Sequence, residues 1–246
     1  MSSEQQIVFT KENLDTCLKE VAREYRKLTK GAMPAELILV GGAAVLAGYG
    51  FREMTTDVDA LILAASSMKD AVNRVGDRLG LPNGWLNADF RRTDSYSPRL
   101  AEYSSYYKTF FNVLRVRTIS AEYLIAMKLK AGRIYKKDLS DVLGILAAHE
   151  KQGRPIGMEQ IRRAVENLYG DWSSLPERSA QFLTRIMQTP DLDALYQEIA
   201  ANEREAGDIL VDFEQKYPGV AHLSNTDDIL KSLRERQHKH DEDLER

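Results

Sequence analysis

Two consecutive glycines lie between an apolar run and a stretch of small residues, and this arrangement constrains the fold more than any other feature. Residues 36–40 are apolar after the first position, as expected of a strand buried on both faces. Gly41 and Gly42 come directly after it, and residues 43–47 predict a short helix. Glycine lets a backbone approach phosphate closely, and a helix N-terminus offers free N–H groups. A lone diglycine more often forms only a tight turn, so its weight depends on the residues after it.

An acidic pair stands near the start of the next predicted strand, residues 55–63 (TTDVDALIL). Asp57 and Asp59 flank Val58, so strand alternation places both carboxylates on one face. Such a pair is repulsive unless a cation lies between the carboxylates, and Mg²⁺ (or Mn²⁺) prefers oxygen ligands of this kind. A lone Asp-x-Asp is commonly a solvated strand end. Placed after the diglycine, and backed by apolar residues, it predicts a site for a metal and a triphosphate.

The remaining pattern predicts an α+β fold, with a small mixed-sheet core, flanking helices and a helical C-terminal region. We expect the core at residues 1–152 and the helical region at 153–246, divided near Gly153 and Pro155. Within the core we expect helices at 10–30, 66–79, 120–133 and 137–150, a strand at 111–119, and a loop with one poorly defined strand at 85–108. Beyond it we expect only helices, at 158–169, 176–187, 192–216 and from 227 onward.

Composition excludes several classes of protein. The 246 residues carry a formal net charge of −3, which argues against a DNA-coating protein with a basic surface. Cys17 is the only cysteine, which excludes an internal disulfide and a cysteine-rich zinc site and makes the cytoplasm the expected compartment. The first ten residues lack the apolar run of a signal peptide, and no stretch approaches the roughly 18 apolar residues of a membrane span. We therefore expect no membrane partner.

The charge is distributed unevenly along the chain. Residues 84–137 hold eleven Lys and Arg against four Asp and Glu, a net +7. Residues 201–246 hold seven against twelve, a net −5. A basic middle in an otherwise acidic chain predicts an anionic ligand there.

Two stretches resemble a known superfamily. The stretch LVGGAAVLAGYGFREMTTDVDALIL resembles the signature of the polymerase β-type nucleotidyltransferases, in which a Gly-Gly or Gly-Ser turn precedes an acidic-x-acidic strand. The stretch SAEYLIAMKLKAGRIYKKDLSDVLGIL resembles the Lys, Arg and Lys-Asp motif of the minimal and AbiEii-like branches, which include toxins of toxin–antitoxin and phage-defence systems. The resemblance covers residues 36–146 and does not extend to the C-terminal helices.

The resemblance assigns roles to residues of both stretches. It implies that Gly41 and Gly42 contact phosphate and that Asp57 and Asp59 bind the metal. Arg52 matches an arginine of the superfamily, which implies a contact with phosphate or with Asp57.

The second stretch supplies the basic residues. By resemblance Lys128 neutralises the triphosphate, while Arg133, Lys137 and Asp138 fall on the nucleotide-binding helical motif together with Asp141. A surface helix with Lys, Arg and Asp is ordinary, and a solvated face explains this pattern equally well.

One departure concerns the third carboxylate, which the superfamily usually carries on a later strand. The predicted strand 111–119 holds no acid, so the candidates are Asp89, Asp94 and Glu102. We choose Asp89 because it comes after the apolar residues 85–86, which would anchor it. Without a third acid the acceptor hydroxyl would lack its base, and activity would be weak, substrate-assisted or absent.

The resemblance implies a metal-dependent nucleotidyltransferase that moves a nucleoside monophosphate from an NTP to a macromolecular hydroxyl. The expected acceptor is RNA, such as tRNA, or a protein, and a toxin of this kind would have a cognate antitoxin. Two alternatives stay open. The first is an inactive homologue that binds a nucleotide or a partner, and the second is a helical scaffold whose acidic pair is incidental.

A basic acceptor groove is the feature that would favour RNA. We expect Arg91, Arg92, Arg115 and Arg117 to line it, interleaved with tyrosines on which bases stack. The alternative for the arginines is pairing with the acidic C-terminal helices. The alternative for Tyr103, Tyr106 and Tyr107, which we favour, is a half-buried position on a strand.

Overall fold

Five strands form one mixed sheet in the computed structural model, which describes residues 7–133, 135–222 and 225–244, the last of these without side chains beyond residue 235. The strands are β1 (Ala35–Leu39), β2 (Val58–Leu63), β3 (Leu86–Asn87), β4 (Ser104–Phe110) and β5 (Leu114–Ile119). Their order across the sheet is β3-β2-β1-β5-β4, with β1 antiparallel to β2 and parallel to β5. The predicted α+β class is thereby confirmed.

The sheet register gathers the polar segments at one edge. Leu39, at the end of β1, pairs with Ala60 on one side and with Thr118 on the other. The end of β1 therefore lies beside the start of β2 and the end of β5. On the far side of β2, Asp59 pairs with Asn87 of β3. The segments after β1 and β3, and the one that precedes β2, consequently meet at this edge.

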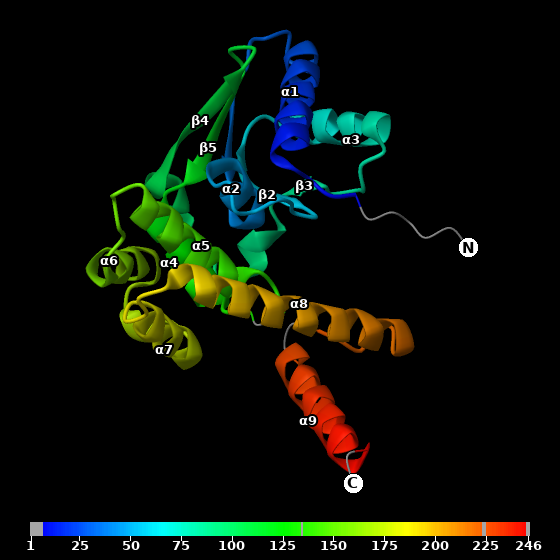
Figure 1. The fold of residues 1–246 in the computed structure, drawn as a ribbon. Coiled ribbons are helices and arrows are strands. Elements are labelled where there is room, and N and C mark those ends of the chain that lie inside the picture. The colour runs from blue at the N-terminus through cyan, green and yellow to red at the C-terminus, as the bar shows by residue number, and fades with distance from the viewer. Residues whose placement is uncertain (1–6, 134, 223–224, 245–246) are drawn as a thin grey trace.

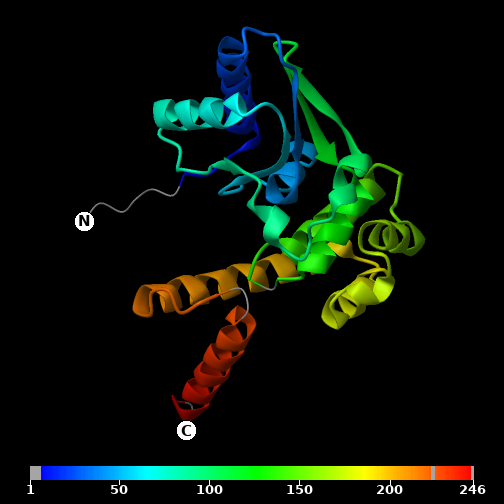
Figure 2. The same cartoon turned by 180° about the vertical axis from the view of Figure 1, so that it is seen from behind.

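Nine α-helices of the described residues accompany the sheet. They are α1 (Lys11–Leu28), α2 (Gly41–Gly48), α3 (Ser67–Leu79), α4 (Ala121–Ala131), α5 (Asp138–Lys151), α6 (Met158–Tyr169), α7 (Glu177–Ile186), α8 (Leu192–Lys216) and α9 (Thr226–Leu244). Figures 1 and 2 show α1 and α3 together on one side of the molecule, with α4 and α5 between them and the C-terminal helices. Three short 3₁₀ helices, Asp89–Arg92, Pro98–Tyr103 and Trp172–Ser174, complete the described structure.

The C-terminal helices pack on the core through α5 and α4. α8 runs along α5, and α6 packs against α4 (Figure 1). The all-helical character expected beyond residue 155 is confirmed, while the division at residue 152 stays a prediction. Within the described residues, no helix combines the length and the apolar character that a bilayer crossing demands.

Three expected boundaries differ from the structure. β2 begins at Val58, so Asp57 precedes the strand by one residue instead of lying on it. The strand expected at 111–119 begins at Leu114, because Phe111 and Asn112 adopt φ of 51° and 53° in a turn. The segment 85–108 contains β3, two short 3₁₀ helices and most of β4, which is more structure than its irregular pattern indicated.

A tight aromatic contact fixes the segment between α2 and β2 against α5. A Cβ atom placed on Gly144 of α5 would lie 2.6 Å from ring atoms of Phe51. The Phe51 ring also contacts Tyr49 and, edge-on, Tyr196 of α8, with centroid separations of 5.6 Å and 5.9 Å. Gly144 therefore allows Phe51 to wedge between two helices and to hold the chain that leads to Asp57.

We expect Gly144→Ala to lower the free energy of unfolding by about 1–3 kcal/mol, because the added methyl group overlaps the Phe51 ring. The matched control is Gly48→Ala at the end of α2, where a Cβ atom would meet nothing within 4 Å. There the change should be neutral or stabilising by up to about 1 kcal/mol. Urea denaturation of both variants measures the difference. Equal stability of the two variants would contradict the proposed wedge.

Candidate active site

The glycine turn lies directly against the acidic pair. Gly41 opens α2 with φ of 55°, a left-handed value that favours glycine. A Cβ atom on Gly41 would lie 3.6 Å from Oδ2 of Asp59. The strand, turn and acidic strand that the sequence predicts are therefore brought together in space, and Gly41 lines a cavity beside them.

Gly42 faces the opposite way. A Cβ atom there would lie 2.7 Å from both Nη2 of Arg52 and Oγ1 of Thr55, and Gly42 does not line the cavity. Its lack of a side chain allows Arg52 to pack beneath the turn. The resemblance implied that both glycines contact phosphate. The structure brings Gly41 to the cavity wall, but not Gly42.

The cavity has a volume of about 370 Å³ and walls of three kinds. Its carboxylates come from the start of β2 and the residue before it, from the segment after β3 and from the start of α5. Its cations come mainly from α4 and the residues after it, and its apolar surface comes mainly from α4 and Phe90. The side chains that line it include Asp57, Asp59, Asn87, Asp89, Phe90, Arg92, Thr93, Ser95, Leu124, Met127, Lys128, Arg133 and Asp138. Acids, cations and an apolar surface are the three environments that a metal–nucleotide complex requires.

The carboxylates influence one another. Burial and, to a smaller extent, the negative charge of Asp57 raise the pKa of Asp59, Arg133 partly offsets them, and the net value is about 6. Asp89 also raises this pKa, in keeping with its place on the same cavity wall. A cation bound among these carboxylates would offset their repulsion and lower the pKa of Asp59.

The donor set suits a metal that shares its ligands with a substrate. Among the described residues, no three His, Cys, Asp or Glu side chains lie close enough together to hold a metal ion by themselves. Mg²⁺ commonly takes only one or two protein carboxylates and completes its shell with substrate phosphates and water. Asp57 and Asp59 meet that requirement.

Lys128 is buried between two carboxylates. Its Nζ lies 2.9 Å from Oδ1 of Asp138 and 2.7 Å from Oδ2 of Asp141, and only 7% of the residue is exposed. Burial lowers the pKa of Lys128, but Asp141 and Asp138 more than offset that effect and raise it above its ordinary value. Lys128 lines the cavity, as predicted, yet its charge is already matched from within the protein.

Arg52 completes this cluster from the other side. Its Nη1 donates to Oδ2 of Asp141, and its Nε donates to the carbonyl of Met54. Arg52 does not line the cavity, so the structure does not bring it to the place where a phosphate contact was expected. Arg52 instead packs against the turn that contains Gly42 and connects this turn to Asp141 at the start of α5.

Arg133 and Lys137 differ sharply in position. Nε of Arg133 donates to Oδ2 of Asp138 at 2.8 Å, and Arg133 lines the cavity. Burial would raise the pKa of Asp138, but Lys128 and Arg133 overcome that effect and hold the value at about 2. Lys137 is exposed and is absent from the cavity wall. Asp138 and Asp141 are buried, so the alternative of a solvated helix face is wrong for them.

A glutamate far along the chain supports this helix end. Glu203 of α8 is buried, and its Oε1 accepts hydrogen bonds from the N–H groups of Leu139, at 2.9 Å, and Ser140, at 3.4 Å. Burial raises the pKa of Glu203 to about 7, against the lowering effect of these hydrogen bonds. The sequence did not predict a role for Glu203, because α8 contains several acidic residues and nothing in the pattern distinguishes a buried glutamate from a solvated one.

The expected arginine groove does not form as a unit. Arg92 lines the cavity, but Arg115 and Arg117 do not. Arg117 lies 3.6 Å from Glu36 of β1, so pairing with the acidic C-terminal helices, the alternative for these arginines, is also wrong for it. Arg91 lies over the ring of Tyr96, 5.5 Å from its centroid.

The three tyrosines behave differently from one another. Tyr107 is half-buried and donates to Asp15 at 2.8 Å, as the strand alternative predicted. Tyr106 is 66% exposed, and Tyr103 precedes β4 and stacks on Tyr123 at a centroid separation of 3.8 Å.

Comparison with known proteins places the core in one family. Residues 16–149 match a family model described as "Nucleotidyltransferase of unknown function (DUF6036)". The match includes the glycine turn, all four cavity carboxylates and the Lys128 cluster, and it ends before Glu203. No curated protein and no solved structure matches the chain.

Removing the charge of Lys128 should destabilise the whole protein, because two buried carboxylates would then lose a shared cation. We expect Lys128→Met to lower the free energy of unfolding by about 3–5 kcal/mol. The exposed Lys137, changed to Met, should shift it by less than about 0.5 kcal/mol. Denaturant titration measures the free energy of unfolding of both variants. A Lys128→Met protein as stable as wild type would refute the stabilising role of the buried cluster.

Glu203 should make stability depend on pH. Because its folded pKa lies above the ordinary value, the stability that it contributes is fully present below about pH 4 and is lost as the pH rises through about 7. Glu203→Gln keeps the accepting oxygen without the charge, so its advantage over wild type should grow by about 1–3 kcal/mol between pH 4 and pH 8. Urea titrations across this range measure it, with the exposed Glu205→Gln on the same helix as control. A constant difference would contradict the assignment.

Proposed function

The chain belongs to the nucleotidyltransferase family of unknown function DUF6036, and on that premise we propose that it moves a nucleoside monophosphate from an NTP to a macromolecular hydroxyl group. The observation that carries the proposal is a single cavity in which Asp57, Asp59 and Asp89 face Lys128 and Arg133. Such a cavity suits a polyphosphate and its cation, because each charge of the ligand meets its opposite.

The NTP would lie with its phosphates between the two charged walls. Mg²⁺ or Mn²⁺ held by Asp57 and Asp59 would polarise the α-phosphate and neutralise its oxygens. α2 begins at Gly41, which lines the cavity, so the free N–H groups of its first turn would be available to phosphate at this end. Arg133 is better placed than Lys128 to meet the leaving pyrophosphate, since it has one carboxylate partner where Lys128 has two.

The chemical step needs a base near the acceptor. The acceptor oxygen attacks the α-phosphorus, the bond from that phosphorus to the bridging oxygen of the β-phosphate breaks, and pyrophosphate leaves. We assign the acceptor's proton to the carboxylate of Asp89, which lines the cavity with Asp57 and Asp59. Apolar side chains of α4 and Phe90 would receive the base or sugar.

A second candidate is a weakly active or inactive homologue that binds a nucleotide or a partner. The observation in its favour is that, within the described part of the chain, no trio of metal-ligating side chains gathers. NTP binding without turnover would select it.

The biological setting is proposed on resemblance alone. The likeness of residues 120–146 to the AbiEii-like branch supports a toxin whose target is an RNA, such as tRNA, or a protein, and whose action a cognate antitoxin blocks. Expression with and without the neighbouring gene would test this role.

The acidic pair is the test of the enzyme itself. We expect Asp57→Asn combined with Asp59→Asn to lower metal-dependent pyrophosphate release by on the order of a thousandfold or more, with stability unchanged or raised. The measurement uses each NTP with total cellular RNA and protein as acceptors.

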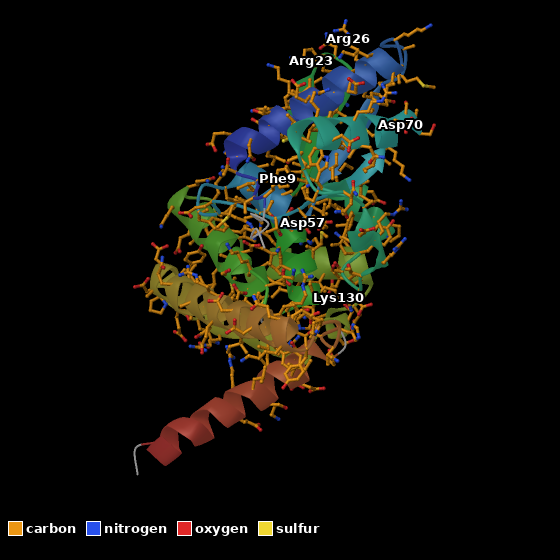
Figure 3. All side chains as sticks on the ribbon, turned by 90° about the vertical axis from the view of Figure 1, so that its right-hand side faces the viewer. Phe9, Arg23, Arg26, Asp57, Asp70 and Lys130 are labelled. Atoms are coloured by element: carbon orange, nitrogen blue, oxygen red, sulfur yellow. The ribbon has the colours of Figure 1, made fainter. Side chains whose placement is uncertain are left out.

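The matched control is Asp70→Asn combined with Asp77→Asn on the exposed face of α3. Asp70 lies well away from Asp57 (Figure 3), and this variant should retain full activity. Unchanged turnover in the Asp57 and Asp59 variant, or equal loss in both variants, would sink the proposal.

A further inference from the structure

A second hollow adjoins the active-site cavity and shares a wall with it. It measures about 250 Å³, and we call it the annex. Five residues line both spaces: Arg92, Thr93, Ser95, Ala131 and Arg133. The annex alone is lined by Asp94, Lys130, Tyr135, Arg178 of α7 and Asp227 of α9. The C-terminal helices thus form the outer wall of a space that opens beside the carboxylates.

The annex is positively charged. Four cationic side chains, Arg92, Lys130, Arg133 and Arg178, face two carboxylates, Asp94 and Asp227.

Two of these cations have no carboxylate partner among the described side chains. Nζ of Lys130 donates to the carbonyl of Ser174 and lies 5.6 Å from the centroid of the Tyr169 ring, and Arg92 is exposed. Both positive charges are therefore available to an anion.

A third cation can exchange its partner. Arg178 pairs with Asp227, but the two side chains are 47% and 41% exposed. Exposed ion pairs contribute little to stability, so a phosphate can replace the carboxylate of Asp227 at small cost.

We propose that the annex binds the phosphate nearest the 3′ end of a single-stranded RNA acceptor, whose terminal hydroxyl then reaches Asp89. This inference rests on the proposed function. Asp89 begins the same short 3₁₀ helix that ends at Arg92, so the shared wall lies on the side of the proposed base. The acceptor hydroxyl has to lie beside this base, so the annex suits the acceptor and not the NTP.

The chemistry of the annex favours RNA over a protein acceptor. A protein chain offers uncharged backbone, whereas an RNA end brings one phosphate for each nucleotide. The volume suits a single nucleotide, and therefore an unpaired end instead of a duplex. Figure 3 shows Lys130 nearer to Asp57 than to Arg23 and Arg26, which lie at the other end of the molecule.

The first test changes the two cations that line only the annex. Lys130→Met combined with Arg178→Met should weaken binding of a twelve-nucleotide single-stranded RNA about tenfold or more at low salt. The slope of log affinity against log salt should shrink by about 0.7, since the annex neutralises one phosphate and each single-strand phosphate contact accounts for about 0.7.

The control is Arg26→Met combined with Lys30→Met, which removes the same charge from a hollow lined by Arg23, Arg26, Lys27, Lys30 and Phe111 at the far end of the molecule. Its affinity for the RNA should be close to that of wild type. Equal weakening in the two double variants would mean diffuse attraction and would overturn the proposal.

A second measurement has a wild-type arm that does not depend on how the variants fold. The same RNA with a neutral methylphosphonate as its last linkage should bind wild type about tenfold more weakly, and should bind the Lys130 and Arg178 variant as the ordinary RNA does. A wild-type protein indifferent to this linkage would overturn the proposal, as would an absence of salt-dependent RNA binding, which would favour a protein acceptor.

NTP binding separates this inference from the proposed function. Affinity for NTP with Mg²⁺ should be unchanged in the Lys130 and Arg178 variant, and an equal loss of NTP and RNA affinity would assign the annex to the nucleotide. If the wild type binds RNA as expected but releases no pyrophosphate, the proposed function fails while the annex assignment stands.

Discussion

Two buried carboxylates at the start of α5 hold together three cations that come from different parts of the chain. Asp138 binds Lys128 and Arg133, and Asp141 binds Lys128 and Arg52. A buried charge without a partner is far more costly than a buried pair, so each of these groups depends on the others. The cluster therefore joins the glycine turn, α4 and α5 into one unit, and the cavity is the open face of that unit.

The charge balance of the cavity results from this arrangement. On the α4 and α5 side, each cation is anchored by a carboxylate before any ligand arrives. On the β2 side, Asp57, Asp59 and Asp89 have no such partner among the described side chains, and burial beside Asp57 raises the pKa of Asp59 to about 6. The cations of the α4 and α5 side are thus paired within the protein, while the three acids of the β2 side are not, and such acids gain most from binding a metal ion.

Local pattern predicted most of the helices and the central strands, because each depends on neighbours in the sequence. The combination of motifs predicted that the glycine turn and the acidic pair lie together. β4 was predicted only as a poorly defined strand within residues 85–108, since it is an edge strand with exposed or half-exposed side chains and no clear alternation. The position of Arg52 escaped prediction, because its carboxylate partner stands 89 residues further on. Which charged residues face a ligand and which face each other is decided by such long-range pairs, and a linear pattern does not contain them.

The position of Glu203 late in the chain determines when, during translation, the start of α5 receives its hydrogen-bond partner. The N–H group of Leu139, from which Glu203 accepts a hydrogen bond, belongs to a helix made 64 residues earlier. While the chain is being translated, α4 and α5 emerge with their acidic and basic residues but without this support, and the first turn of α5 has only water to bond to. The hydrogen bonds from the start of α5 to Glu203 can form only after α8 has been made. A nascent chain that already carries every cavity carboxylate therefore still lacks this support.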